Sequence, residues 1–290
     1  MNYFTIFPLL VALLHPGYFS YLTPYSLSSI RISPKTYTGG LSPVIGHAKF
    51  PVQWHVAQWG ILDELPITPV WLGANHWQLS NAYGIVESKN DEGTLRLSLD
   101  STNAQFGCGE FDLNIEPDVK FVYPAYPEPM LPFDDRPTLA TATNLRYGAL
   151  QEVSSAFQGT RCPGVENLAS TMMALTFLNL TSHQVIFYQV VTYDSRGAEF
   201  NGFWFFSGPT EFGVNDSVDR LGGNALKVGE GPLFYDLDIL PRIKIHIANG
   251  PTGLDKDLSH WKVSGLYLSA NTNGEAKIDS NHGYIFLIGQ

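Results

Sequence analysis

The chain has 290 residues, of which 44% are hydrophobic, 13% aromatic and 15% charged. This length suits one large all-β domain, and the composition excludes a wholly disordered chain. The formal net charge of -10, with only 17 Lys and Arg residues, argues against a nucleic-acid or anionic-membrane surface. Neutral glycans, cations or another protein are the partners that the composition favours.

The first 14 residues form an apolar run that is too short to cross a bilayer, which takes about 20 residues. We expect residues 1–20 to be a signal peptide or hydrophobic leader of a secreted, extracellular protein. The run has no basic start and no good cleavage site, so an N-terminal element of the fold is the alternative. Residues 21–48, rich in Pro, Gly, Ser and Thr, are expected to be an extended lead-in to a single domain over residues 49–290.

Short segments rich in β-branched and aromatic residues follow, separated by turn residues. Many short strands and few helical patterns predict an all-β fold, an antiparallel β-sandwich or jelly roll with at most one or two short helices. The predicted strand segments include Trp77–Ser88, Thr94–Asp100, Glu110–Glu116, Thr171–Leu180, His183–Asp194, Phe200–Gly208, Trp261–Ala270 and Glu275–Gly289.

One helix candidate is the segment Tyr235–Gly250. Ile239, Ile243 and Ile247 recur there at every fourth position, and Gly250 is a typical residue after a helix end. Ile243, Ile245 and Ile247 also alternate with polar residues, so a strand is the alternative.

Cys108 and Cys162 lie in Gly- and Pro-rich surroundings that are typical of loops. In an oxidising compartment they are expected to form one disulfide bond, which stabilises the fold by roughly 4 kcal/mol in the chain-entropy model. Two buried free thiols are the alternative. Residues 117–137 contain several prolines, which lack a ladder donor, and this stretch is predicted to be a surface excursion.

Polar residues alternate with apolar ones at Glu110, Asp112, Asn114 and Glu116. Residues two apart on a strand share a face, with Cα atoms about 6.6 Å apart, so Glu110 and Asp112 are candidate catalytic residues for glycoside hydrolysis. Glu116 would lie about 20 Å from Glu110 on a straight strand. Alternation is also the ordinary pattern of a half-buried strand, so catalysis, glycan or metal binding and plain solvent exposure all stay open.

Gln189 and Tyr193 interrupt the apolar pattern of the segment His183–Asp194, and Arg196 follows it. A lyase acting on a uronate needs a base such as Tyr and a group that steadies the carboxylate. His183, Tyr193 and Arg196 could fill these roles, and Gln189, Tyr193 and Arg196 are the candidates for substrate binding. For Arg196, a structural ion pair with Asp194 is the alternative.

Trp54 and Trp59 lie among polar residues and offer flat apolar faces for sugar rings. They are further candidates for substrate binding, with core packing as the alternative.

The eight histidines show no metal-ligand spacing, so no metal site and no cofactor is expected. A structural Ca²⁺ held by oxygen ligands in residues 90–93 or 214–219 stays open.

The stretches Phe106–Pro117 and Asp257–Ile278 resemble the concanavalin A-like superfamily of lectins, glucanases and polysaccharide lyases. The resemblance implies two large antiparallel sheets whose concave face takes a glycan. The glucanases of that superfamily carry Glu-x-Asp-x-Glu or Glu-x-Asp-x-x-Glu, whereas here Glu116 follows Asp112 after three intervening residues. The Arg-rich strand, Gln-x-His strand and terminal Tyr motif of its alginate lyases are not found intact.

The sequence therefore predicts a secreted carbohydrate-binding protein with a polysaccharide or glycan as partner, and glycoside hydrolase or lyase chemistry stays open. The alternative is a non-catalytic extracellular structural or adhesive protein that self-associates through its N-terminal extension. Nucleic acid and membrane are not expected as partners.

Overall fold

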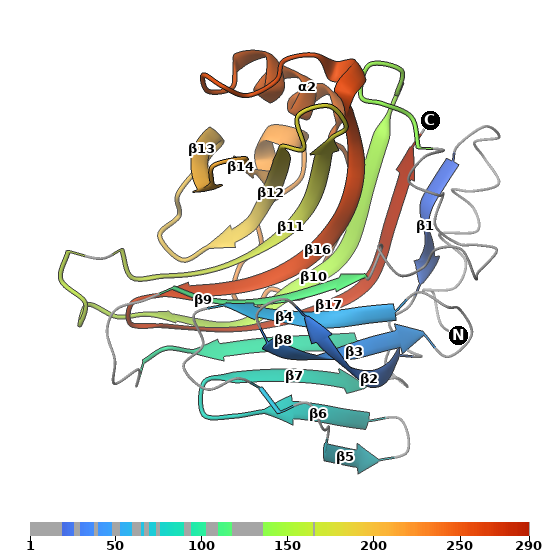
Figure 1. The fold of residues 1–290 in the computed structure, drawn as a ribbon. Helices are drawn as coiled ribbons and strands as arrows, with labels where there is room; N and C mark the ends of the chain where they lie inside the picture. Colours follow the sequence, from blue (N-terminus) through green and yellow to red (C-terminus); the bar gives the residue numbers. More distant parts are fainter. Residues whose placement is uncertain are drawn as a thin grey trace.

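The computed structural model describes residues 19–25, 30–37, 40–47, 53–59, 65–66, 70–73, 76–89, 94–102, 110–117, 136–164 and 166–289. Within these ranges the chain forms two large β-sheets, one α-helix and short 3-10 turns (Figure 1). The prediction of an all-β sandwich with at most one or two short helices is confirmed for these ranges. No helix in the described ranges is long and apolar enough to cross a membrane.

Sheet A has the strand order β15–β10–β17–β8–β7–β6–β5, and β1 pairs with the end of β17. All of its pairs are antiparallel. Its strands are β1 (Phe19–Tyr25), β5 (Val70–Gly73), β6 (His76–Ser80), β7 (Gly84–Lys89), β8 (Thr94–Asp100), β10 (Leu145–Gln158), β15 (Leu233–Asp238) and β17 (Ala276–Gly289).

Sheet B has the order β13–β14–β12–β11–β16–β9–β4–β3–β2. The pair β12 and β14 is parallel, and the other pairs are antiparallel. Its strands are β2 (Ile30–Tyr37), β3 (Gly40–His47), β4 (Gln53–Trp59), β9 (Glu110–Pro117), β11 (Leu168–Asn179), β12 (Val185–Asp194), β13 (Asn201–Gly208), β14 (Glu211–Ser217) and β16 (Trp261–Asn273). The described parts of the predicted lead-in are thus strands of the two sheets, and the domain boundary at residue 49 stays a prediction.

The last two described strands, β16 and β17, each lie in the interior of one of the two sheets. Strand β16 lies between β11 and β9 in sheet B, and β17 lies between β10 and β8 in sheet A. The two are joined by a tight turn in which Gly274 has φ of 66°, a backbone conformation that favours glycine. The long strands β11 and β16 curve strongly (Figure 1).

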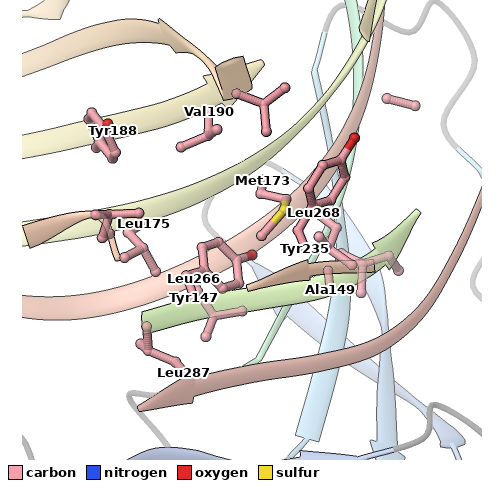
Figure 2. Packing of buried hydrophobic residues seen from close by; sticks show 14 of the residues in the cluster. Tyr147, Ala149, Met173, Leu175, Tyr188, Val190, Tyr235, Leu266, Leu268 and Leu287 are labelled. Carbon is pink, nitrogen blue, oxygen red and sulfur yellow. The ribbon is translucent and has the colours of Figure 1, made fainter. Parts of the chain in front are cut away.

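The core lies between the sheets and is built from period-two alternation. Leu95, Leu97 and Leu99 of β8 are fully buried, because every second side chain of a strand points to the same face. Figure 2 shows Leu175 of β11 and Leu266 of β16 among the buried side chains of this core. The two sheets therefore bury one continuous apolar layer.

The helix prediction over Tyr235–Gly250 is correct only in its second half. Helix α2 spans Leu240–Asn249 and buries Ile243 and Ile247 against the core, whereas Leu233–Asp238 is strand β15. The isoleucines at every fourth position therefore predicted α2 correctly, but the predicted segment began five residues before the first residue of the helix. Pro241 marks the true start, because proline is favoured in the first turn of a helix.

The predicted strand segment Trp77–Ser88 is a hairpin of two strands, β6 and β7. The side chain of Asn81 accepts hydrogen bonds from the backbone N–H groups of Tyr83 and Gly84, at 2.9 Å each. An asparagine that bonds to the backbone two residues ahead is a turn former, so it interrupts the strand pattern here.

Candidate active site

Strand β9 turns its two kinds of residue to opposite sides of sheet B. Phe111, Leu113 and Ile115 are buried in the core between the sheets. Glu110 and Asp112 alternate with them and therefore lie on the face of sheet B turned away from this core, called the outer face from here on. The sequence prediction that these two carboxyl groups share one face is consistent with this placement.

Strand β16 supplies the partners of both carboxyl groups. Its Asn271 is paired with Asp112 in the register, and the Asn271 amide donates to Glu110 Oε1 at 2.9 Å and to Asp112 Oδ1 at 3.2 Å. The hydroxyl of Ser269 also donates to Asp112 Oδ1, at 3.2 Å. Asn271 and Ser269 are nearly fully buried. One buried amide thus holds two carboxyl groups together.

The shared amide limits the separation of the two carboxyl groups. Both oxygens bond to the same nitrogen of Asn271 at 2.9 and 3.2 Å, so they are at most about 6 Å apart. With one N–H directed at each oxygen, the ~120° angle of a planar amide places them about 5 Å apart. Retaining glycosidases have carboxyl groups ~5–5.5 Å apart, and inverting ones ~6.5–9.5 Å. A separation of at most about 6 Å is shorter than the inverting range and compatible with the retaining one.

The environments of the two carboxyl groups differ. Burial, followed by the nearby negative charge of Glu110, raises the pKa of Asp112 from 3.8 to about 6, although the hydrogen bonds from Asn271 and Ser269 oppose the shift. The Glu110 side chain is exposed to solvent. Asp112 is therefore suited to hold a proton at mildly acidic pH beside a carboxyl group in water.

Asn114 continues the row on β9 and is paired with Ser269. It is 5% exposed, and its Oδ1 has no hydrogen-bond partner within the described part of the chain. The backbone of Glu116 belongs to β9, but its side chain is outside the described set.

Strand β4 lies next to β9 and carries the two tryptophan candidates. In the register Trp59 is opposite Asp112, and Trp54 is opposite Pro117. Trp59 thus occupies the register position of the carboxyl pair, and Trp54 lies near the other end of β9. Their roles in substrate binding stay predictions.

A β-bulge separates the two candidates on β12. Gln189 lies on the outer face, where its amide donates to the hydroxyl of Tyr267 at 2.8 Å. The register between β11 and β12 shifts after the pair of Met172 and Val191, so Tyr193 is opposite the fully buried Thr171 and packs against the core. The structure therefore does not bring Tyr193 to the carboxyl pair.

The Arg196 side chain forms ion pairs with two acidic side chains, Asp194 and Glu166. Its guanidinium donates to both oxygens of Asp194, at 2.9 and 2.6 Å, and also contacts Glu166. The Phe200 ring lies 5.8 Å from the guanidinium carbon. This geometry is that of the structural ion pair weighed from the sequence, and a bidentate pair leaves little of the cation for a uronate.

The segment 214–219, considered as a Ca²⁺ loop, is the end of β14 and a 3-10 turn (Val218–Leu221). Its fully buried Asp216 accepts from Arg242 at 2.7 and 2.8 Å, from His246 at 2.8 Å and from Tyr188 at 3.1 Å. These donors come from helix α2 and β12 and occupy the Asp216 carboxylate, so this side chain is not available to a Ca²⁺ ion. In the described ranges no cluster of three or more metal-ligating side chains occurs.

Several other sequence predictions lie wholly or partly outside the described residues. They are the residues 1–18 of the leader, the loop 90–93, most of the excursion 117–137, and Cys108. The disulfide bond between Cys108 and Cys162 therefore stays a prediction.

Asn271, Ser269 and Asn114 were not identified as site residues from the sequence. Their one local signal is polar alternation: Ser269, Asn271 and Asn273 on β16 repeat the pattern of Glu110 and Asp112 on β9. Two such rows lie side by side only when their strands pair, and a single sequence does not reveal that pairing.

No family model matches the chain, and no curated protein matches it. Among solved structures, it is similar to the family 11 xylanase from Neocallimastix patriciarum, with a TM-score of 0.44 and 7% identity over 89% of this chain and 95% of that chain. It is also similar to endoglucanase 3 of family GH12 from Trichoderma harzianum, with a TM-score of 0.36 and 8% identity over 89% and 96%. Likeness at this level assigns no family, so concanavalin A-like membership stays a prediction and function must rest on the site.

Proposed function

We propose that the chain is a secreted glycoside hydrolase that cleaves a polysaccharide at the outer face of sheet B. The observation that carries the proposal is the carboxyl pair Glu110 and Asp112, held by the one buried amide of Asn271 with the pKa of Asp112 raised to about 6. Two carboxyl groups at this separation with divergent environments are the arrangement that glycoside hydrolysis requires.

Asp112 is the general acid and Glu110 the nucleophile. Protonated Asp112 gives its proton to the glycosidic oxygen as the bond to the anomeric carbon breaks, and a Glu110 oxygen bonds to that carbon. Water then attacks the anomeric carbon, Asp112 takes the proton of that water, and the bond to Glu110 breaks. The sugar is released with its original anomeric configuration.

Asn271 and Ser269 are positioning residues in this mechanism. The Asn271 amide donates to both carboxyl groups and sets their separation, and the Ser269 hydroxyl fixes Asp112 Oδ1. With Oδ1 held by these donors, Oδ2 of Asp112 is the oxygen that carries the transferred proton. Burial of both positioning side chains keeps water from competing for these hydrogen bonds.

The test is a reducing-sugar assay over a panel of polysaccharides, with release of unsaturated uronate measured in parallel. Glu110→Gln and Asp112→Asn should each lower kcat by ~10²-fold or more, because each removes one partner of the acid and nucleophile pair. NMR of the first product should show retained anomeric configuration. Inverted product would refute the role of Glu110 as nucleophile, and activity unchanged in both variants would remove the pair from the active site.

A further inference from the structure

Two rows of residues cross the outer face of sheet B toward its β13 edge, away from the carboxyl pair. Register pairs join the first row from β16 to β13 through Tyr267, Ala174, Gln189, Asn215 and Phe203. They join the second row through Gly265, Thr176, Phe187, Gly213 and Phe205. Residues paired in register lie on the same face, so both rows share the face of Asp112.

The first row carries polar groups suited to hydroxyls. The Gln189 amide donates to the Tyr267 hydroxyl at 2.8 Å, across the small Ala174. The next residue in the row, Asn215, has a buried Oδ1 with no hydrogen-bond partner among the described residues. Buried polar oxygens in folded proteins are nearly always bonded, so this acceptor calls for a donor from a bound molecule or solvent.

Aromatic rings lie beside these amides. The Phe203 side chain is paired with Asn215 and is 59% exposed. The Phe205 ring lies over Gly213, since a Cβ at that glycine would be 1.9 Å from the ring. Glycine thus makes room for a ring that lies flat on the sheet. An apolar ring surface beside a few oriented amides is the usual composition of a binding site for a small polar ligand.

The rows are also uncharged. None of the residues in either row is Asp, Glu, Lys, Arg or His, and the whole chain carries a net charge of -10. A uronate carboxylate placed here would meet no cation in these rows and would be repelled by the overall charge. A neutral sugar carries no charge, so this electrostatic repulsion does not weaken its binding.

The side of β14 that faces the core is held by hydrogen bonds. Asp216 follows Asn215 on β14 and points to the opposite face, where it is fully buried and bonded to Arg242, His246 and Tyr188. Fixing β14 from behind orders Asn215 before any ligand arrives, which lowers the entropic cost of binding.

We propose that Gln189, Asn215, Phe203 and Phe205 form a binding subsite for a neutral sugar residue of the polysaccharide, called the edge subsite. Four strand spacings of ~4.8 Å separate β9 from β14, and the first row lies four residues, or about 13 Å, along β16 from Asn271. Measured along the sheet, the edge subsite therefore lies about 23 Å from the carboxyl pair. Only a chain of several sugars reaches both. The inference rests on the proposed function for the nature of the ligand but does not depend on the carboxyl chemistry.

Binding is measured by calorimetry in the Glu110→Gln variant, so that no probe is consumed. The probes are cellohexaose, mannohexaose and xylohexaose, with hexamannuronate as the charged comparison. Phe203→Ala should weaken binding of the preferred neutral hexaose about ten-fold, as expected for one lost ring contact. The matched control is Phe206→Ala, because Phe206 is 65% exposed on the same strand but is paired with the buried Phe212.

A second readout keeps the test independent of folding. Both variants should stay folded, and Phe206→Ala should be the less stable in thermal unfolding because it loses the contact between the Phe206 and Phe212 rings, while only Phe203→Ala binds more weakly. Asn215→Ala should also weaken binding of the hexaose.

The outcomes separate the two proposals. If the wild-type protein hydrolyses a glycan but Phe203→Ala and Phe206→Ala bind it equally, the edge subsite is refuted and the hydrolase stands. If a neutral hexaose binds in a Phe203-dependent way without turnover, the subsite stands and the hydrolase falls. Preference for hexamannuronate refutes the neutral subsite, and binding of no probe together with no turnover refutes both.

Discussion

Replacing Asp112 by asparagine should stabilise the folded protein, and more so as pH rises. Burial and the Glu110 charge raise the pKa of Asp112 to about 6 in the folded protein, from 3.8. A raised carboxyl pKa contributes stability that is fully present below the unfolded value of about 3.8 and lost as pH rises through about 6. At neutral pH Asp112 is ionised, and its burial and the Glu110 charge therefore lower the free energy of unfolding of the wild-type protein.

The magnitude follows from the shift. About 2 pKa units correspond to up to about 3 kcal/mol at pH 7.5, while at pH 4 the cost is under about 1 kcal/mol because the folded carboxyl is protonated. Asparagine keeps an oxygen that can accept from Asn271 and Ser269, so these two hydrogen bonds are retained. The gain in free energy of unfolding for Asp112→Asn should therefore grow by about 2 kcal/mol between the two pH values.

Urea unfolding of both proteins at pH 4 and pH 7.5 measures this difference. Asp100→Asn is the control of opposite sign, because hydrogen bonds from Lys277 and Thr102 outweigh burial and lower the pKa of Asp100. That variant should lose stability at pH 7.5 and less at pH 4. A gain for Asp112→Asn that is equal at both pH values would refute the account of this carboxyl group.

Three further predictions concern side chains outside the catalytic pair. Asp216→Ala should lower the free energy of unfolding by ~3–5 kcal/mol in urea, because it leaves the Arg242 charge without its carboxylate; a loss below ~1 kcal/mol would contradict this. Gly202→Ala should cost about 1–3 kcal/mol, since φ is 77° and a Cβ would lie 2.4 Å from His246; an unchanged Tm would be the contrary result. Burial lowers the pKa of His282 to about 3, so the stability that the neutral ring contributes above pH 6.5 is lost as pH falls toward 3. In the variant His282→Gln, Tm should therefore fall less steeply between pH 6.5 and pH 4 than in the wild-type protein. An equally steep fall in the variant would contradict this prediction.

Strands marked by alternation or by many β-branched and aromatic residues were predictable from the sequence, and a strand with neither mark was not. The segment Thr94–Asp100, with a leucine at every second position, is strand β8 with the predicted bounds. Strand β10 was missed, because small residues such as Gly148, Ala149 and Ser154 replace the β-branched and aromatic residues that mark strands. Its burial comes from its place between β15 and β17, which is a property of the whole sheet.

The carboxyl pair was predictable because two residues on one strand follow a local rule. Asn271, which holds the pair, lies 161 positions from Glu110, and no local pattern links the two. Tyr193 was grouped with Gln189 because strict alternation puts both on one face. The bulge at Thr192 changes the face, and a bulge depends on the partner strand as well as on the sequence of its own.

The central place of β16 and β17 has a consequence for biosynthesis. These strands are the last part of the described chain to leave the ribosome, yet each completes the middle of a sheet. Until they arrive, β9 and β11 have no neighbour between them, and β8 and β10 likewise expose unpaired edges that invite aggregation. Pairing of the two sheets therefore cannot be completed before β16 and β17 have been synthesised, and the Asn271 amide reaches Glu110 and Asp112 only in this step. A nascent chain stalled before Trp261 should stay bound to chaperones, with neither sheet closed.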